Sequence, residues 1–109
     1  MTDEKRKDRL EPVAAKTKGR WNAIEQAKVF AALADPLRVR FMEQVSDGQE
    51  HTGTDLAAEL GISLALLCHH SKILVEADVV QKRKSAQTSY YKVRRETLAR
   101  AFAQLTIRS

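Results

Sequence analysis

The sequence predicts a mainly α-helical domain with one small β-hairpin, in the order helix, helix, helix, helix, strand, strand, helix. Three observations predict this α+β fold class. Apolar residues recur at helical spacing near both ends of the chain, and two central helices are joined through Gly61. From Val79 the residue pattern changes from helical to strand-like. Two helices joined by a few residues through a glycine form a helix-turn-helix arrangement.

The first two helices are predicted on either side of Asp35-Pro36. Apolar residues from Trp21 to Ala34 recur at helical spacing, and Asp35-Pro36 ends that helix and starts another. Asp35 is a suitable N-cap, and proline at the first helical position loses no hydrogen bond. The second helix closes at Ser46-Asp47-Gly48, where Gly48 is able to adopt positive φ.

The central pair of helices begins with a capping box at Thr52–Asp55, ahead of a short helix over residues 56–60. Gly61 ends that helix, and Ser63 caps the next, which runs to about Ala77. We expect one side of the longer helix to face the core, with Leu66, Leu67, His70, Ile73, Leu74 and Ala77. The outward side then carries Leu64, Ala65, Cys68, His69, Lys72 and Val75.

A hairpin and a final helix complete the predicted order. Strands are expected over residues 79–84 and 88–93, separated by residues 85–87, with one of Tyr90 and Tyr91 in the core. The last helix, residues 96–106, carries an apolar stripe. Because a small chain with apolar helices at both ends has little core of its own to cover them, we expect a homodimer.

Charge is distributed unevenly over the 109 residues, whose net charge is +5. Residues 1–20 carry +3, residues 21–81 carry −5, and residues 82–109 carry +7. We interpret residues 1–20 as a flexible basic arm and residues 21–109 as the folded domain. Basic ends favour a polyanionic partner such as nucleic acid.

Other classes of protein are disfavoured. A single cysteine, Cys68, excludes an intramolecular disulfide and fits a reducing compartment. Apolar runs fall short of the ~18 residues of a membrane span. The charged N-terminus does not resemble a signal peptide, so we expect a cytoplasmic protein. No nucleophile–base pair or phosphate-binding glycine loop indicates an enzyme.

Four blocks of sequence resemble the ArsR/SmtB family of winged-helix repressors. ALADPLRVRF over residues 32–41 is similar to the family's ALADPTRLRIL, and LAAELGIS over residues 56–63 to LAEALGLS. CHHSKILVEADVV over residues 68–80 resembles SRHLKVLREAGLV, and SYYKV over residues 89–93 resembles VYYRL. The blocks occur in family order and at family spacing.

The resemblance implies a winged helix-turn-helix homodimer whose first and last helices form the interface. Two recognition helices would enter successive major grooves, roughly 34 Å apart, with the wings over the flanking backbone. The family mostly represses transcription and releases DNA when an inducer binds or a thiol is oxidised. Double-stranded operator DNA is thus the expected partner, with the inducer unknown.

Ten residues are candidates for DNA contact under this resemblance. They are Ser63, Leu64, Ala65, Cys68, His69 and Lys72 on the recognition helix, Lys82, Arg83 and Lys84 on the wing, and Arg38. Leu64 and Ala65, where the family often has Gln and Ser, are able to meet thymine methyl groups. Three alternatives stay open: a protein contact at the apolar residues, a merely solvated basic run on the wing, and an ion pair between Arg38 and an acid such as Glu43.

Two sensor sites of the family lack their ligands, and we expect no metal or other cofactor. Thr52 and Thr54 stand where metal-sensing relatives place cysteines, and no histidine follows His70. Successive helical residues diverge by about 100°, so Cys68, His69 and His70 do not converge on one ion. We therefore expect His70 to be a hydrogen-bonded core histidine, and a metal-responsive repressor with a non-standard site remains the alternative.

Cys68 is a candidate redox switch. The dipole of the recognition helix and His69 would favour its thiolate, and oxidation there would add bulk or charge at the DNA surface. The alternative is a small semi-buried residue that replaces the family's serine.

Overall fold

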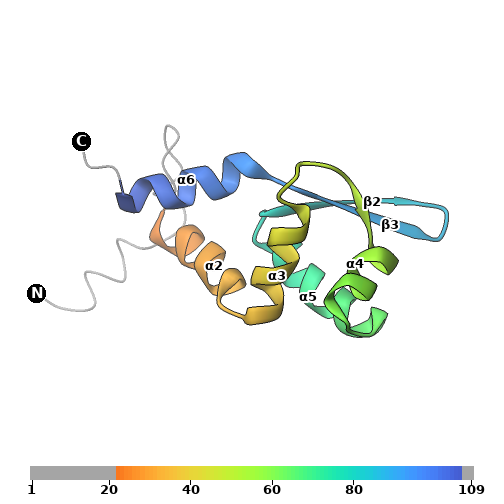
Figure 1. The fold of residues 1–109 in the computed structure, drawn as a ribbon. Coiled ribbons are helices and arrows are strands. Elements are labelled where there is room, and N and C mark those ends of the chain that lie inside the picture. The colour runs from red at the N-terminus through yellow and green to blue at the C-terminus, as the bar shows by residue number, and fades with distance from the viewer. Residues whose placement is uncertain (1–21, 107–109) are drawn as a thin grey trace, which may run out of the picture.

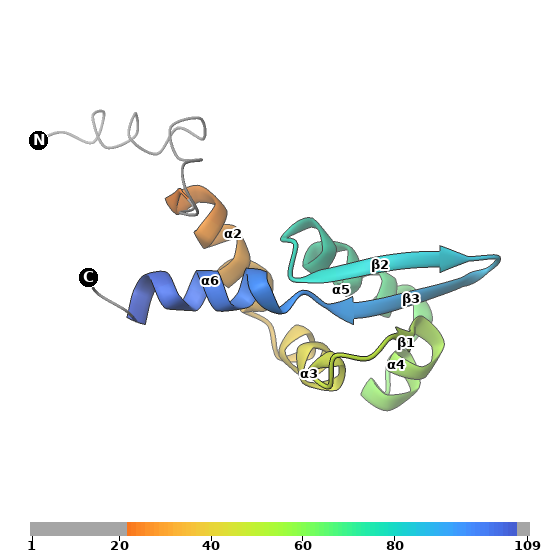
Figure 2. The same ribbon diagram turned by 90° about the horizontal axis from the view of Figure 1, so that it is seen from above.

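The computed structural model describes residues 22–106, and the predicted basic arm lies outside this range. The elements are α2 (Ala23–Leu33), α3 (Pro36–Val45), β1 (His51–Thr52), α4 (Gly53–Leu60), α5 (Leu64–Glu76), β2 (Val80–Ser85), β3 (Thr88–Val93) and α6 (Arg95–Thr106). The hairpin projects from one end of the molecule, while α2 and α6 pack together at the other (Figure 1; Figure 2). The predicted fold class is confirmed.

Side chains cap the helices where the sequence predicts. Asp35 Oδ2 accepts from the N–H groups of Leu37 and Arg38 at 2.9 and 3.2 Å, which starts α3 after Pro36. Ser63 starts α5, and Gly61 ends α4 with a φ of 69°. Thr52 caps α4, which begins at Gly53, three residues before the predicted start. The capping residue directly precedes the first helical residue, so Thr52 itself fixes that start.

The sheet has three strands in the order β1-β3-β2, and β1 is a strand that the sequence did not predict. His51 pairs with Tyr91, and Thr52 with Tyr90, in antiparallel register. Two residues are too few to show the alternation that identifies a strand. The predicted connection of residues 85–87 is also one residue too long, because Ser85 pairs with Thr88 and leaves a two-residue turn.

Tyr91 lies at the centre of the core between the sheet and the helices. Its ring packs edge-on against Phe41, with centroids 5.7 Å apart, and both side chains are fully buried. Ser71 Oγ on α5 donates to the Cys68 carbonyl at 3.0 Å and, 3.2 Å from the Tyr91 hydroxyl, accepts the hydrogen bond of that tyrosine. Serine therefore suits this buried position, since leucine, the usual family residue, would offer the tyrosine hydroxyl no hydrogen-bond partner.

The core face of α5 agrees with the prediction except at Leu66. Leu67, His70, Leu74 and Ala77 are buried, whereas Leu66 is 38% exposed. The prediction for Leu66 is wrong because this residue lies in the first turn of α5, at the edge of the apolar stripe, where the core ends.

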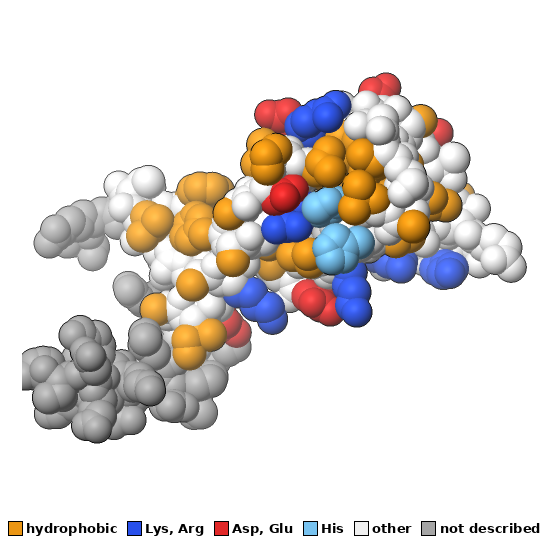
Figure 3. All heavy atoms as spheres, turned by 90° about the horizontal axis from the view of Figure 1, so that it is seen from below, with side chains coloured by type: hydrophobic (Ala, Val, Ile, Leu, Met, Phe, Trp, Pro, Cys, Tyr) orange, Lys and Arg blue, Asp and Glu red, His pale blue; other side chains and the backbone are white. Residues whose placement is uncertain are grey.

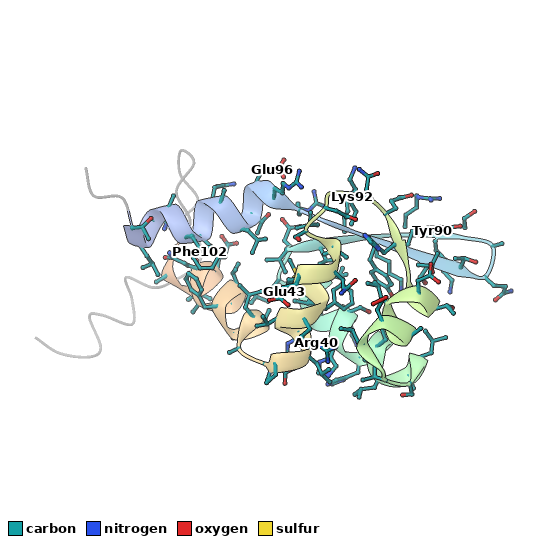
Figure 4. All side chains as sticks on the ribbon, viewed as in Figure 1. Arg40, Glu43, Tyr90, Lys92, Glu96 and Phe102 are labelled. Carbon is teal, nitrogen blue, oxygen red and sulfur yellow. The ribbon has the colours of Figure 1, made fainter. Side chains whose placement is uncertain are left out.

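An apolar face remains exposed where α2 and α6 pack together. Phe102 contacts Phe30 with ring centroids 5.3 Å apart, and Gln26 Nε2 donates to the Ala101 carbonyl at 2.9 Å. Figure 4 shows Phe102 at this end of the molecule, on the side of α6 that faces α2. Even so, Ile24, Phe102 and Leu105 are 45%, 47% and 67% exposed.

None of the helices within residues 22–106 alone has the length and composition of a membrane span. Within these residues, only α4 and α5 taken together are long and apolar enough, and the two helices are bent by 107° at the break between them.

Candidate nucleic-acid interface

The outward face of α5 carries the six recognition-helix candidates, and all six are exposed. They are Ser63, Leu64, Ala65, Cys68, His69 and Lys72. Ala65, His69 and Lys72 follow one another at helical spacing and form a single stripe. Figure 3 shows hydrophobic side chains gathered beside the histidines on this face of the molecule.

His70 lies on the buried side of α5, where it is held by α3, and its ring packs edge-on against that of His69 with centroids 5.2 Å apart. The residue is 7% exposed, and Arg38 Nη1 donates to its Nδ1 at 3.0 Å. Because a guanidinium group only donates, Nδ1 accepts and the imidazole proton is on Nε2. His70 is therefore the hydrogen-bonded core histidine that the sequence predicts.

Burial is the main cause that lowers the pKa of His70 below its ordinary value. Asp35, whose Oδ2 lies 4.0 Å from Nδ1, acts in the opposite direction, while Arg38 and His69 add to the lowering. Burial opposes the ionised form of Asp35, but hydrogen bonds from the backbone of Arg38 and Leu37 lower its pKa overall.

The sequence suggested that Arg38 contacts a DNA phosphate or an acid such as Glu43. In the structure its side chain has two other partners. Its Nε donates to the Ala32 carbonyl at 2.6 Å, and Nη1 contacts His70. The guanidinium group thus connects the end of α2, the start of α3 and the buried side of α5. This arrangement positions the recognition helix, and the phosphate contact of Arg38 stays a prediction.

The basic run on β2 is divided between the two faces of the hairpin. Lys82 is opposite the buried Tyr91, and Lys84 is opposite Ser89. Directly opposed residues share a face, so both lysines lie on the side of the hairpin that packs toward α5. Arg83 is opposite Tyr90 and lies on the other side.

Arg83 already has an acidic partner. Its Nε and Nη2 donate to Glu50 Oε2 and Oε1 at 2.9 and 2.8 Å, and its guanidinium carbon lies 4.2 Å from the centre of the Tyr90 ring. The hydrogen bond from Arg83 lowers the pKa of Glu50. Sequence reasoning missed Glu50, because nothing in the chain order indicates that β1 brings this carboxylate within reach of Arg83 across β3.

A shallow hollow lies on the Arg83 side of the sheet. It has a volume of about 410 Å³ and is lined by Gly48, Gln81, Lys92, Val93, Arg94, Arg95 and Glu96. Lys92 and Glu96 lie on the side of the sheet away from α4 and α5 (Figure 4). This hollow is therefore separate from the α5 face.

The described residues offer no cluster of three or more His, Cys, Asp or Glu side chains arranged to hold a metal ion. His51 Nε2 lies 2.9 Å from Asp47 Oδ1, so this histidine has a partner on the α3–β1 turn. Cys68 is a free, exposed thiol on α5.

A helix-turn-helix followed by a hairpin, with basic residues beside an exposed second helix, defines a winged helix-turn-helix protein. The family model described as "Bacterial regulatory protein, arsR family" matches residues 35–82. The chain is 33% identical over 63 residues to the transcriptional repressor SdpR of Bacillus subtilis, covering 58% of this chain and 69% of that protein. The chain belongs to the arsR family of bacterial regulatory proteins, which are transcriptional regulators and not enzymes.

Two further comparisons agree with this assignment. The chain is 36% identical over 69 residues to an SmtB homologue of Synechocystis, described as a transcriptional repressor. That match covers 63% of this chain and about half, 52%, of the relative. A homodimeric winged helix-turn-helix DNA-binding domain from Mycobacterium bovis has a TM-score of 0.64 and 25% identity, over 77% of each chain.

Proposed function

We propose that two copies of this chain form a repressor that binds operator DNA with α5 in the major groove and the β2–β3 hairpin over the backbone. The observation that carries the proposal is the position of three exposed lysines. Lys72 lies on the exposed face of α5, and Lys82 and Lys84 lie on the side of the hairpin that packs toward this helix. Cations on two adjoining elements that face the same way suit the phosphates on either side of one groove.

The dimer supplies the second recognition helix. Packing of α2 against α6 leaves apolar side chains of both helices exposed. We expect the same surface of a second copy to cover them. The homodimeric relative from Mycobacterium bovis supports this pairing. A two-fold dimer predicts an operator with two related half-sites.

Release of the operator is the second part of the proposal. Cys68 is exposed on the same face as His69 and Lys72, so an adduct on its sulfur would stand between α5 and the DNA. A peroxide would oxidise the Cys68 thiol to a sulfenic acid and itself be reduced to water or an alcohol. A small-molecule disulfide would instead exchange with the thiol, leave a mixed disulfide on Cys68 and release one small thiol, and both products need only a single cysteine. A small-molecule inducer is the alternative means of release.

A salt titration of binding to duplex DNA tests the proposed function. The full chain is expected to bind a random duplex at low salt, with log K falling by about 0.9 per neutralised phosphate for each unit of log[salt]. A chain that shows no binding even at low salt is a protein-interaction module instead, for which the exposed Leu64 and Leu66 would provide the contact. Treatment with a thiol-alkylating reagent is expected to weaken binding of the wild type and to leave Cys68→Ser unaffected.

A further inference from the structure

The first turn of α5 presents three successive apolar side chains to solvent. Leu64 is 51% exposed, Leu66 is 38% exposed, and Ala65 between them is exposed as well. Ser63 Oγ accepts from the Leu66 N–H at 3.0 Å and fixes the backbone of this turn. We call these three residues the α5 apolar patch.

The α5 apolar patch lies at the start of the helix, directly after the exposed cap residue Ser63. His69 and Lys72, one and two turns further on, are the exposed side chains of this face that have nitrogen donors. Leu64 leans toward α4, since its Cδ1 lies 3.6 Å from the position that a β-carbon on Gly53 would occupy. The leucine is thus supported from one side and open on the other.

The chemistry of the α5 apolar patch restricts what it is able to read in DNA. Arginine, asparagine and glutamine recognise bases through paired hydrogen bonds, which leucine and alanine side chains cannot form. The one apolar group that a base presents in the major groove is the C5-methyl group of thymine. 5-Methylcytosine carries a methyl group at the same ring position.

We infer that Leu64 and Leu66 recognise pyrimidine C5-methyl groups in the major groove, an inference that rests on the proposed DNA-binding function. Charge favours DNA over an apolar protein surface as the occupant of the α5 apolar patch. Lys72 continues the stripe of Ala65, which lies between the two leucines, and Lys82 and Lys84 lie on the side of the hairpin toward α5, so cations border the α5 apolar patch. An apolar protein partner would offer these lysines no negative groups, whereas DNA offers phosphates.

The test compares operators that differ only in methyl groups. The full chain first selects its preferred duplex from a random library, and the thymines of each half-site are then replaced one at a time by deoxyuridine. Removal of one recognised methyl group is expected to raise Kd about fourfold, and removal of the equivalent group in both half-sites about sixteenfold. Cytosine at the same position is expected to bind weakly, with about fourfold recovery when it is methylated at C5.

Two variants locate the effect. Leu64→Ala combined with Leu66→Ala removes the larger side chains but keeps a good helix former at both exposed positions. Its affinities for the thymine and deoxyuridine duplexes are expected to be nearly equal. Lys72→Ala is the matched control, because it should weaken binding to both duplexes and preserve their ratio.

Each outcome decides a separate point. A wild-type chain that binds both duplexes equally overturns methyl recognition, although its DNA binding would still support the proposed function. A ratio that persists in the double variant overturns the assignment to Leu64 and Leu66. Absence of DNA binding at low salt overturns the proposed function and the inference with it, and circular dichroism checks that each variant is folded.

Discussion

Arg38 Nη1 lies 3.0 Å from His70 Nδ1, and this contact joins the first turn of α3 to the buried side of α5. Asp35, the N-cap of α3, lies 4.0 Å from the same nitrogen. Three charged or titratable side chains thus meet where the recognition helix is held against the domain. A proton on Nδ1 would remove the acceptor for Arg38 and place a second cation beside it.

The first prediction concerns pH. Because burial holds the pKa of His70 below its ordinary value of about 6.5, the unfolded chain takes up this proton first as pH falls. The contribution of His70 to the free energy of unfolding is therefore complete above about pH 6.5 and is lost as pH falls toward the folded-state pKa. Urea unfolding at pH 7.5 and 5.5 should show this loss in the wild type.

His70→Asn provides the comparison for that measurement. Its amide oxygen is able to accept from Arg38 but does not titrate, so this variant should lose less free energy of unfolding between the two pH values. His69→Gln is the control for an exposed neighbouring histidine and should keep most of the wild-type dependence, because His69 is the smallest of the causes that lower the pKa of His70. Equal pH dependence in the wild type and His70→Asn would contradict the role assigned to His70.

The second prediction separates the cations of the hairpin. Lys82 and Lys84 lie on the side facing α5, whereas Arg83 lies on the other side and is bound to Glu50. Lys82→Ala with Lys84→Ala should therefore reduce the salt slope of DNA binding by about 0.9 for each phosphate that the variant no longer neutralises. Arg83→Ala should have a smaller effect, measured in the same titration.

Glu50→Gln gives the matched test of the Arg83 pair. It removes one negative charge, so DNA binding should become tighter, but its salt slope should change little because the released Arg83 lies on the side of the hairpin away from the DNA. If Arg83→Ala flattens the slope as much as the double lysine variant does, the proposed docking face of the hairpin is wrong.

The third prediction concerns the dimer. Leu105 is the most exposed of the large apolar residues on α6, at 67%, so a change there disturbs the folded protomer little. Leu105→Glu should shift the chain toward monomer in sedimentation velocity, because a charge would be buried at the interface. DNA affinity should fall with it, since each complex then has one recognition helix instead of two. Ala58→Glu on α4 adds the same charge elsewhere and should leave the dimer intact.

Local sequence signals predicted most of the helices and strands. The features that could not be predicted depend on contacts between residues that are far apart in the sequence. Asp35, Ser63 and Gly61 act within a few residues of their own helix ends, so their roles were visible in the chain order. The pairing of Arg83 with Glu50, 33 residues away, depends on β1, which is too short to leave a periodic signal. Leu66 illustrates a different limit, because periodicity gives the direction of a side chain but not where the core ends along the helix.

The fourth prediction concerns Asp78, which connects α5 with α6. Asp78 has a φ of 66°, a left-handed conformation, where the similar family sequence EAGLV has glycine. Its Oδ2 accepts from Thr97 Oγ1 at 3.0 Å, and its Oδ1 lies 2.9 Å from Arg94 Nε. The left-handed conformation is unfavourable for aspartate, but its side chain accepts a hydrogen bond from the first turn of α6 that glycine could not form.

Two substitutions separate these contributions. Asp78→Gly removes both the strain and the side-chain partners, whereas Asp78→Ala removes the partners and keeps an unfavourable φ. Asp78→Ala should therefore have a free energy of unfolding about 1 kcal/mol below that of Asp78→Gly, measured by urea denaturation. Asp78→Asn, whose amide oxygen is still able to accept from Thr97, should be the most stable of the three. If Asp78→Ala is as stable as Asp78→Gly, the left-handed conformation carries no measurable strain at this position.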